Sequence, residues 1–248
     1  MSARHAIIAS AAASLVLLGS APARATAGIP AAGHAIRLGG DLAAAAERRG
    51  EDWVCGTAAI TTPLPVGYPP PTPPGAIDLK TYPSLRRAEV TSRTRQASLG
   101  MNLAFFPLFN HIQRRDIAMT SPVEMDYAGM SVGGGAEPAA AATPGFEAMT
   151  MSFLYRSPEL GPVGLDDQDA KVRVVDTEPA TSLSVGLQGG YGLEHVREGV
   201  ERLQAWLAAN PGWQTVGDVR ALHYNGPERR DRDKWLEVQV PVAPRGTD

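Results

Sequence analysis

The sequence predicts an α+β fold made of two similar β-β-α-β-β halves, which form a twisted antiparallel sheet or a distorted barrel with two covering helices. Two observations support this prediction. Each half begins with two strand-like runs that are joined at a proline turn, Pro83 in the first half and Pro179 in the second. An amphipathic helix and two more strand-like runs then follow in both halves. The repeated order indicates an internal duplication.

The strands are predicted from short apolar and β-branched runs that are bounded by turn residues. The expected strands are 77–82, 85–90, 117–125 and 149–155 in the first half, and 172–176, 182–187, 219–224 and 235–242 in the second. The segment 129–145 is rich in glycine and alanine, which predicts a mobile hairpin loop.

The two helices are predicted from apolar residues that recur every three or four positions. In the second helix these residues are Leu193, Val196, Val200, Leu203 and Leu207. In the first helix they are Met101, Phe105, Leu108 and Ile112. Pro107 stands within the first pattern, and an interior proline costs about 3 kcal/mol. We therefore expect the first helix to be kinked or to start late.

The N-terminal quarter of the chain is predicted to contain two further segments. Arg4 and an apolar run precede a small-x-small pattern that ends at Ala25, so residues 1–25 indicate a signal peptide cleaved after Ala25. Residues 26–75 read as a Pro/Ala-rich lead-in with a short helix at 41–49. The domain is expected at 76–242, followed by a tail at 243–248. This organisation predicts export to the periplasm or the medium, with no membrane span after cleavage.

The composition and the missing motifs point to a binding protein. The formal net charge of −3 argues against nucleic acid as a partner, and Cys55 is the only cysteine. The chain has no phosphate-binding glycine loop, no nucleophile elbow and no zinc-ligand spacing, so no catalytic or metal site is predicted. A tetrapyrrole-directed or hydrolytic activity stays open, with Glu237 and His223 as the first acid and base residues to test.

Several motifs carry a resemblance to a known family. The main ones are Phe105-x-x-Leu108-x-x-His111-Ile112, Ile117-x-Met119-Thr120-x-Pro122-Val123 and Tyr224-Asn225-Gly226-Pro227. Together they make residues 76–242 resemble the SOUL/haem-binding protein family. The resemblance implies a barrel-like fold of two halves and, as in several members, non-covalent binding of haem or another porphyrin beside the first helix. His111 stands where the family has tyrosine, and Thr81 stands where one branch has a possible axial histidine.

The predicted tetrapyrrole surface lies on the outer side of the first helix. Its candidate residues are Leu99, Leu103, Phe106, Phe109, Asn110, His111, Arg114 and Arg115. The apolar members would form a flat strip for a porphyrin ring, and the arginines would pair with propionates. His111 is the nearest imidazole to an iron, or it simply fills the tyrosine position. A basic turn exposed to solvent is the alternative for the two arginines.

An alternative pocket is centred on Glu237 in the expected strand 235–242. Its second candidate residue is His223 in the expected strand 219–224. Related effector-binding domains of the same two-half design place a glutamate from a late strand in a central pocket. If Glu237 is buried in such a pocket, we expect its pKa to be raised. The alternative is that Glu237 lies on an edge strand and points outward into solvent. The alternative function is thus a small-ligand-binding or protein-interaction module, with self-association through Phe106 and Phe109 as one form of it.

Overall fold

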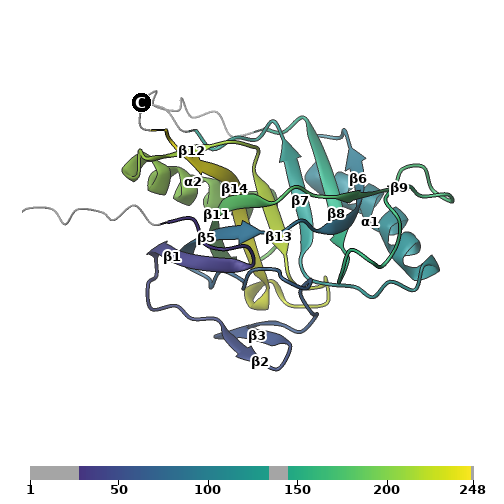
Figure 1. Ribbon diagram of the computed structural model, residues 1–248, viewed down its shortest axis with the longest axis horizontal. Helices are drawn as coiled ribbons and strands as arrows, with labels where there is room; N and C mark the ends of the chain where they lie inside the picture. Colours follow the sequence, from purple (N-terminus) through teal and green to yellow (C-terminus); the bar gives the residue numbers. More distant parts are fainter. Residues whose placement is uncertain (1–27, 134–144, 247–248) are drawn as a thin grey trace, which may run out of the picture.

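A computed structural model describes residues 28–133 and 145–246 of the chain. The predicted signal peptide and most of the predicted loop at 129–145 lie outside the described residues. The predicted α+β class is confirmed, since one large antiparallel sheet is accompanied by the helices α1 (Ala97–Arg114) and α2 (Leu193–Ala209) (Figure 1). Within the described ranges, no helix is long and apolar enough to cross a membrane.

The large sheet has 11 strands in the described part of the chain. These are β1 (His34–Gly40), β5 (Ala76–Tyr82), β6 (Arg86–Ser92), β7 (Val123–Ala128), β8 (Ala148–Leu154), β9 (Gly164–Leu165), β10 (Arg173–Asp176), β11 (Ala180–Gln188), β12 (Trp213–Thr215), β13 (Arg220–His223) and β14 (Trp235–Pro244). Their order is β1-β5-β11-β14-β13-β7-β8-β6-β10-β9, with β12 added to β14. β1 and β9 stand at the two ends of this order and do not pair with each other, so the sheet formed by the described residues is open.

The strand order shows the duplication directly. The first half contributes β5, β6, α1, β7 and β8, and the second contributes β10, β11, α2, β13 and β14. The series β5-β11-β14-β13 is mirrored by β10-β6-β8-β7, and the halves meet where β13 pairs with β7. The first strand of each half pairs with the second strand of the other half. The strands on either side of Pro83 are therefore consecutive in the chain but are not neighbours in the sheet.

Both helices pack on the sheet through the faces that their apolar spacing indicates. Val196, Val200 and Leu203 of α2 are buried in the same core cluster as Leu108 and Ile112 of α1. Of the two expectations for α1, the late start is wrong, because the helix begins at Ala97 and includes Pro107, whereas the kink stays a prediction. An interior proline removes one backbone donor and crowds the preceding turn, and the packing of α1 on β6 and β8 outweighs this cost.

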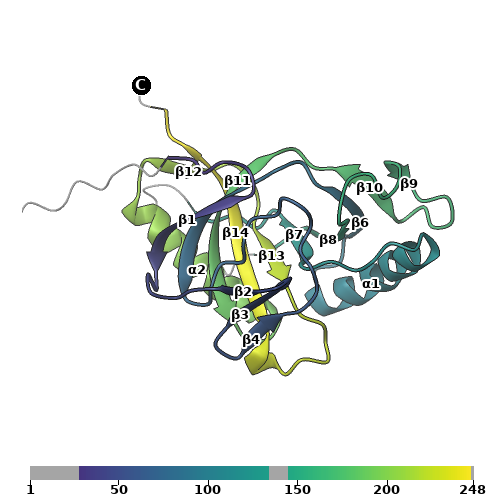
Figure 2. The same cartoon turned by 60° about the horizontal axis from the view of Figure 1, so that its bottom comes forward.

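Side chains alternate along β14, and the alternation separates two layers. Leu236, Val238 and Val240 belong to the core under the helices. Trp235 and Glu237 point to the opposite face, where Trp235 joins a second cluster with residues of the N-terminal lead-in. The sheet therefore has helices on one face and the lead-in over part of the other, as Figure 2 shows.

The lead-in is folded onto the domain. β1 pairs with β5 at the edge of the large sheet, and a separate three-stranded sheet contains β2 (Glu47–Arg49), β3 (Asp52–Cys55) and β4 (Ala58–Ile60). The predicted helix at 41–49 is wrong. The Asp41 carboxylate accepts hydrogen bonds from the backbone N–H groups of Ala43 and Ala44, so this alanine-rich stretch forms a turn.

Candidate functional site

Glu237 lies at the centre of a buried polar network on the face that the lead-in covers. Its side chain is 0% exposed. The carboxylate accepts hydrogen bonds from Lys80 Nζ, the backbone N–H of Thr72, Ser184 Oγ, Tyr224 OH and Gln239 Nε2, all at 2.5 to 2.8 Å. A carboxylate offers about four acceptor positions. Its hydrogen-bonding capacity is therefore used by the protein itself.

The charge of Glu237 is balanced by Lys80. The ammonium nitrogen lies 2.7 and 2.6 Å from the two carboxylate oxygens, and both side chains are 0% exposed. Burial alone would raise the pKa of Glu237, but the Lys80 charge and hydrogen bonds from Ser184 and Tyr224 outweigh burial and lower that pKa. The expectation of a raised pKa is thus wrong, because sequence reasoning did not place Lys80 beside Glu237. Glu237 is also not on an edge strand, since β14 lies between β11 and β13.

The proline-rich part of the lead-in closes this network from outside. The Thr72 backbone N–H donates to Glu237, and its carbonyl accepts from Trp235 Nε1 at 2.7 Å. Gly186 makes the close approach possible, because a Cβ there would lie 2.2 Å from the carbonyl oxygen of Pro73. The extended conformation leaves the backbone N–H and C=O of Thr72 without partners inside the segment. Their hydrogen bonds to Glu237 and Trp235 therefore hold the segment against the sheet.

Tyr68 connects this network to the surface. Its ring meets Tyr82 edge-on at 5.0 Å, and Gln239 Nε2 donates to Tyr82 OH at 2.6 Å. The Tyr68 hydroxyl donates to Glu124 at 3.2 Å, and Glu124 contacts Arg87 at 3.0 Å. Burial is the main cause that raises the pKa of Tyr68, so its hydroxyl stays protonated and donates.

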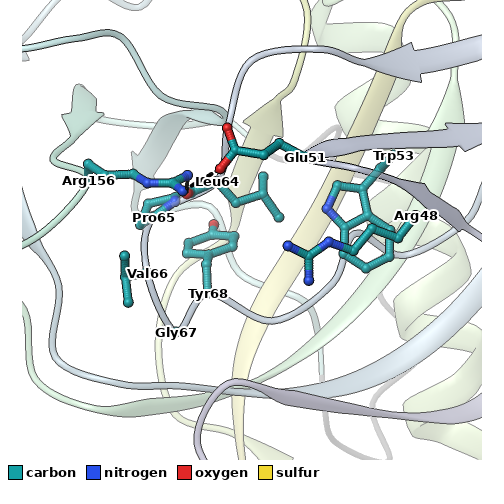
Figure 3. A pocket seen from close by; sticks show the side chains of 9 residues that line it. All are labelled: Arg48, Glu51, Trp53, Leu64, Pro65, Val66, Gly67, Tyr68 and Arg156. Atoms are coloured by element: carbon teal, nitrogen blue, oxygen red, sulfur yellow. Dashed lines mark hydrogen bonds and ion pairs between the residues drawn. The ribbon is translucent and has the colours of Figure 1, made fainter.

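A hollow of about 280 Å³ lies on the outer side of Tyr68. It is bounded by β2 and β3 with the turn between them, by the segment 64–68 and by Arg156, which follows β8, and Figure 3 shows its lining. The lining residues are Arg48, Glu51, Trp53, Leu64, Pro65, Val66, Gly67, Tyr68 and Arg156. Aromatic, cationic and anionic side chains converge there, which is the mixture that small-molecule sites use to fix orientation. Sequence analysis did not identify this hollow.

The outer side of α1 has the exposed apolar residues that the sequence predicted. Leu99, Leu103 and Phe106 are 44%, 53% and 64% exposed, and Asn110 is exposed beside them. Phe109 differs, because it is partly buried against the core and stacks on Phe105 with ring centroids 5.7 Å apart. The exposed strip therefore contains Phe106 without Phe109.

The remaining candidates on α1 are tied together by Asp166. His111 is buried; its Nδ1 donates to the Asp166 carboxylate, and its Nε2 lies 2.7 Å from Tyr155 OH. Arg114 and Arg115 also donate to Asp166. Burial raises the pKa of Asp166, but backbone hydrogen bonds and His111 outweigh it and lower the pKa below its usual range. Both ring nitrogens of His111 therefore have a partner within the protein.

His223 is buried on β13 and lies apart from the Glu237 carboxylate network. Its ring stacks on Tyr191 with centroids 4.0 Å apart, and its Nε2 has no hydrogen-bond partner in the described residues. Burial, with a smaller effect of Lys234, lowers the pKa of His223 to about 3. The described residues also contain no group of three or more His, Cys, Asp or Glu that could hold a metal ion.

Comparison with known proteins identifies a shared fold. No protein-family model matches the sequence, and no curated protein matches it. EcmrR in its DNA complex has a TM-score of 0.51 at 13% identity over 68% of this chain and 57% of that one. The EcmrR C-terminal domain gives 0.49 at 14% identity, covering 68% of this chain and 98% of that one. A hydrolase from Listeria innocua gives 0.47 at 12%, covering 70% and 94%. At these identities the likeness to EcmrR in its DNA complex shows the fold alone.

Proposed function

We propose that this domain binds a small organic molecule in the hollow outside Tyr68. The observation that carries the proposal is the convergence of Trp53, Tyr68 and two arginines on one cavity of about 280 Å³. That volume is close to the lower end of the range for small-molecule sites. The floor is rigid, because Tyr68 is held by Glu124 and by Tyr82. A preformed floor reduces the entropy cost of binding.

We propose further that the domain acts by binding and not by catalysis. A general base needs a lone pair within reach of its substrate. Glu237 uses its oxygens on five protein donors, and His223 is buried against Tyr191. These were the two acid and base candidates from the sequence. Their positions support a binding role. The absence of a nucleic-acid partner stays a prediction.

Calorimetric titration of the purified protein tests the binding site. The probes are 2-naphthoate, 2-naphthamide and 2-naphthylmethylammonium, which share one ring system and differ in charge. Val66 is 66% exposed at the rim, so Val66→Trp should fill the hollow without disturbing the core. We expect at least one probe to bind the wild type and to lose at least tenfold in affinity in this variant. Val163→Trp, at an exposed residue outside the hollow, is the matched control. Equal binding to both variants would contradict the site.

A second candidate function is tetrapyrrole binding on α1, the finer function that the SOUL resemblance implies. Leu99, Leu103 and Phe106 favour it, because three exposed apolar side chains along one helix form a surface that water solvates poorly. Titration with hemin and with metal-free protoporphyrin tests it. Since His111 is fully hydrogen-bonded, we expect the two compounds to bind about equally. Failure of both to bind would eliminate this candidate.

A further inference from the structure

We propose that the hollow selects an anionic aromatic molecule, whose carboxylate binds Arg48 and whose ring packs between Trp53 and Tyr68. This inference rests on the proposed function and specifies its ligand class. The three charged side chains of the lining are Arg48, Arg156 and Glu51, which gives the hollow one net positive charge. The distribution of their hydrogen bonds decides which arginine meets the ligand.

The terminal nitrogens of Arg156 already donate hydrogen bonds within the protein. Its two terminal nitrogens donate to Glu51 at 2.8 Å and to the carbonyl of Leu64 at 2.5 Å. Within the described part of the chain, Arg48 donates a hydrogen bond through its Nε alone, at 3.0 Å to the carbonyl of Gly50. In Figure 3 the Arg48 guanidinium extends from below Trp53 toward Tyr68. Its terminal N–H groups are thus the charged donors that point into the hollow, in the planar geometry that suits a carboxylate.

The charges beneath the floor do not favour a cation. Glu237 is neutralised by Lys80, and neither side chain reaches solvent. Glu124, the acid that touches Tyr68, contacts Arg87 at 3.0 Å and Arg220 at 3.6 Å. A positively charged ligand would therefore meet Arg48 without an unpaired carboxylate to offset the repulsion.

The aromatic part of the ligand is inferred from the aromatic and aliphatic side chains among the lining residues. The guanidinium carbon of Arg48 lies 5.9 Å from the centre of the Trp53 ring, which holds both groups on one side of the hollow. Tyr68 forms the floor, and Leu64, Pro65 and Val66 add apolar contacts. A flat ring system can lie on Tyr68 with its edge toward Trp53, and its carboxylate then reaches Arg48.

The same three naphthalene probes test this inference by calorimetry at low salt. We expect 2-naphthoate to bind about tenfold more tightly than 2-naphthamide, because a charge-assisted bidentate contact replaces a neutral one. The ammonium compound should bind most weakly. Arg48→Gln should bring naphthoate and naphthamide within about threefold of each other. Arg49→Gln is the matched control, since Arg49 is exposed, pairs with Glu47 and does not line the hollow.

The possible failures separate the two proposals. If the amide or the ammonium compound binds as tightly as the carboxylate and Val66→Trp blocks it, the hollow is a ligand site but the anionic class is wrong. If naphthoate keeps its preference in Arg48→Gln, the assignment to Arg48 is overturned. If none of the three compounds binds, the proposed function at this hollow fails as well. Circular dichroism of each variant confirms that the fold is retained.

Discussion

The face of the sheet opposite the helices contains two ionic clusters, and they differ in how they are covered. On the strand series β5-β11-β14-β13, Lys80 and Glu237 lie beneath the lead-in and are both 0% exposed. On the mirrored series β10-β6-β8-β7, Arg87 contacts Glu89, Glu124 and Asp126 at 3.0 to 3.1 Å. There the side chains of Glu89 and Asp126 remain 22% and 31% exposed. Equivalent regions of a duplicated fold have thus acquired different environments.

The difference arises from the lead-in, which packs over Glu237 through Thr72 and leaves part of the Arg87 cluster in contact with water. A buried ion pair gains little net stability, but removing one partner leaves an uncompensated charge in a dry environment. In a partly hydrated cluster, water and the remaining partners compensate for the loss. Substitutions of similar chemistry should therefore have unequal effects on the free energy of unfolding.

Lys80→Met should give the largest effect, a loss of about 3 to 5 kcal/mol in the free energy of unfolding. The reason is that Glu237 would keep its charge or take up a proton, at a cost in either case. Urea denaturation at neutral pH measures this change. Arg87→Met is the matched variant in the hydrated cluster, and we expect it to cost less than half as much.

The double variant Lys80→Met/Glu237→Leu sharpens this comparison. Removing both charges should recover at least half of the stability that the single substitution loses, since the buried charge is then absent. Equal losses for Lys80→Met and Arg87→Met, or no recovery in the double variant, would show that the cover over Glu237 does not exclude water.

The buried histidines His111 and His223 differ in their hydrogen bonds. Both ring nitrogens of His111 have a partner, whereas Nε2 of His223 has none in the described residues. The burial of His223 predicts a pH dependence of stability. The unfolded chain binds a proton at this residue near its ordinary pKa of 6.5, whereas the native pKa is about 3. Between these values the unfolded state holds more protons, so stability falls as the pH decreases from 6.5 toward 3. From pH 6.5 to 4.5 the contribution is about 2 to 3 kcal/mol.

Urea denaturation at pH 7.0 and 4.5 measures this pH dependence for the wild type and for His223→Leu. The variant should lose less stability on acidification than the wild type does. His34→Gln is the control, because His34 is an exposed histidine and its substitution should leave the pH dependence unchanged. An identical pH profile for wild type and His223→Leu would contradict the effect of burial.

The sequence was sufficient to predict the duplicated architecture, because periodicity and turn residues are local signals. α2 and its apolar face were predicted from Val196, Val200 and Leu203, and the structure confirms them. β7 begins at Val123 although a strand was expected from Ile117. Pro122 lacks a backbone N–H for a ladder hydrogen bond, which is the cue that would have shortened this prediction.

The candidate sites were harder to predict, because their partners are distant in sequence. Lys80 and Glu237 are 157 positions apart, and His111 and Asp166 are 55 apart. No periodic pattern connects such pairs. The proline-rich run predicted an extended segment, but its composition did not indicate that Thr72 would dock on Glu237. The contacts depend on strand order, which single-sequence reasoning did not supply.

Phe106→Ala should have the smallest effect on stability, within about 0.5 kcal/mol, because the side chain is 64% exposed. Phe105→Ala is the matched control, since Phe105 is partly buried and its ring contacts Phe109 and Phe153, both with centroids 5.7 Å away. If the α1 strip binds a tetrapyrrole, Phe106→Ala weakens protoporphyrin binding while the melting temperature stays constant. Unchanged affinity would leave the hollow outside Tyr68 as the better candidate, because the exposed strip would then have no measurable part in binding.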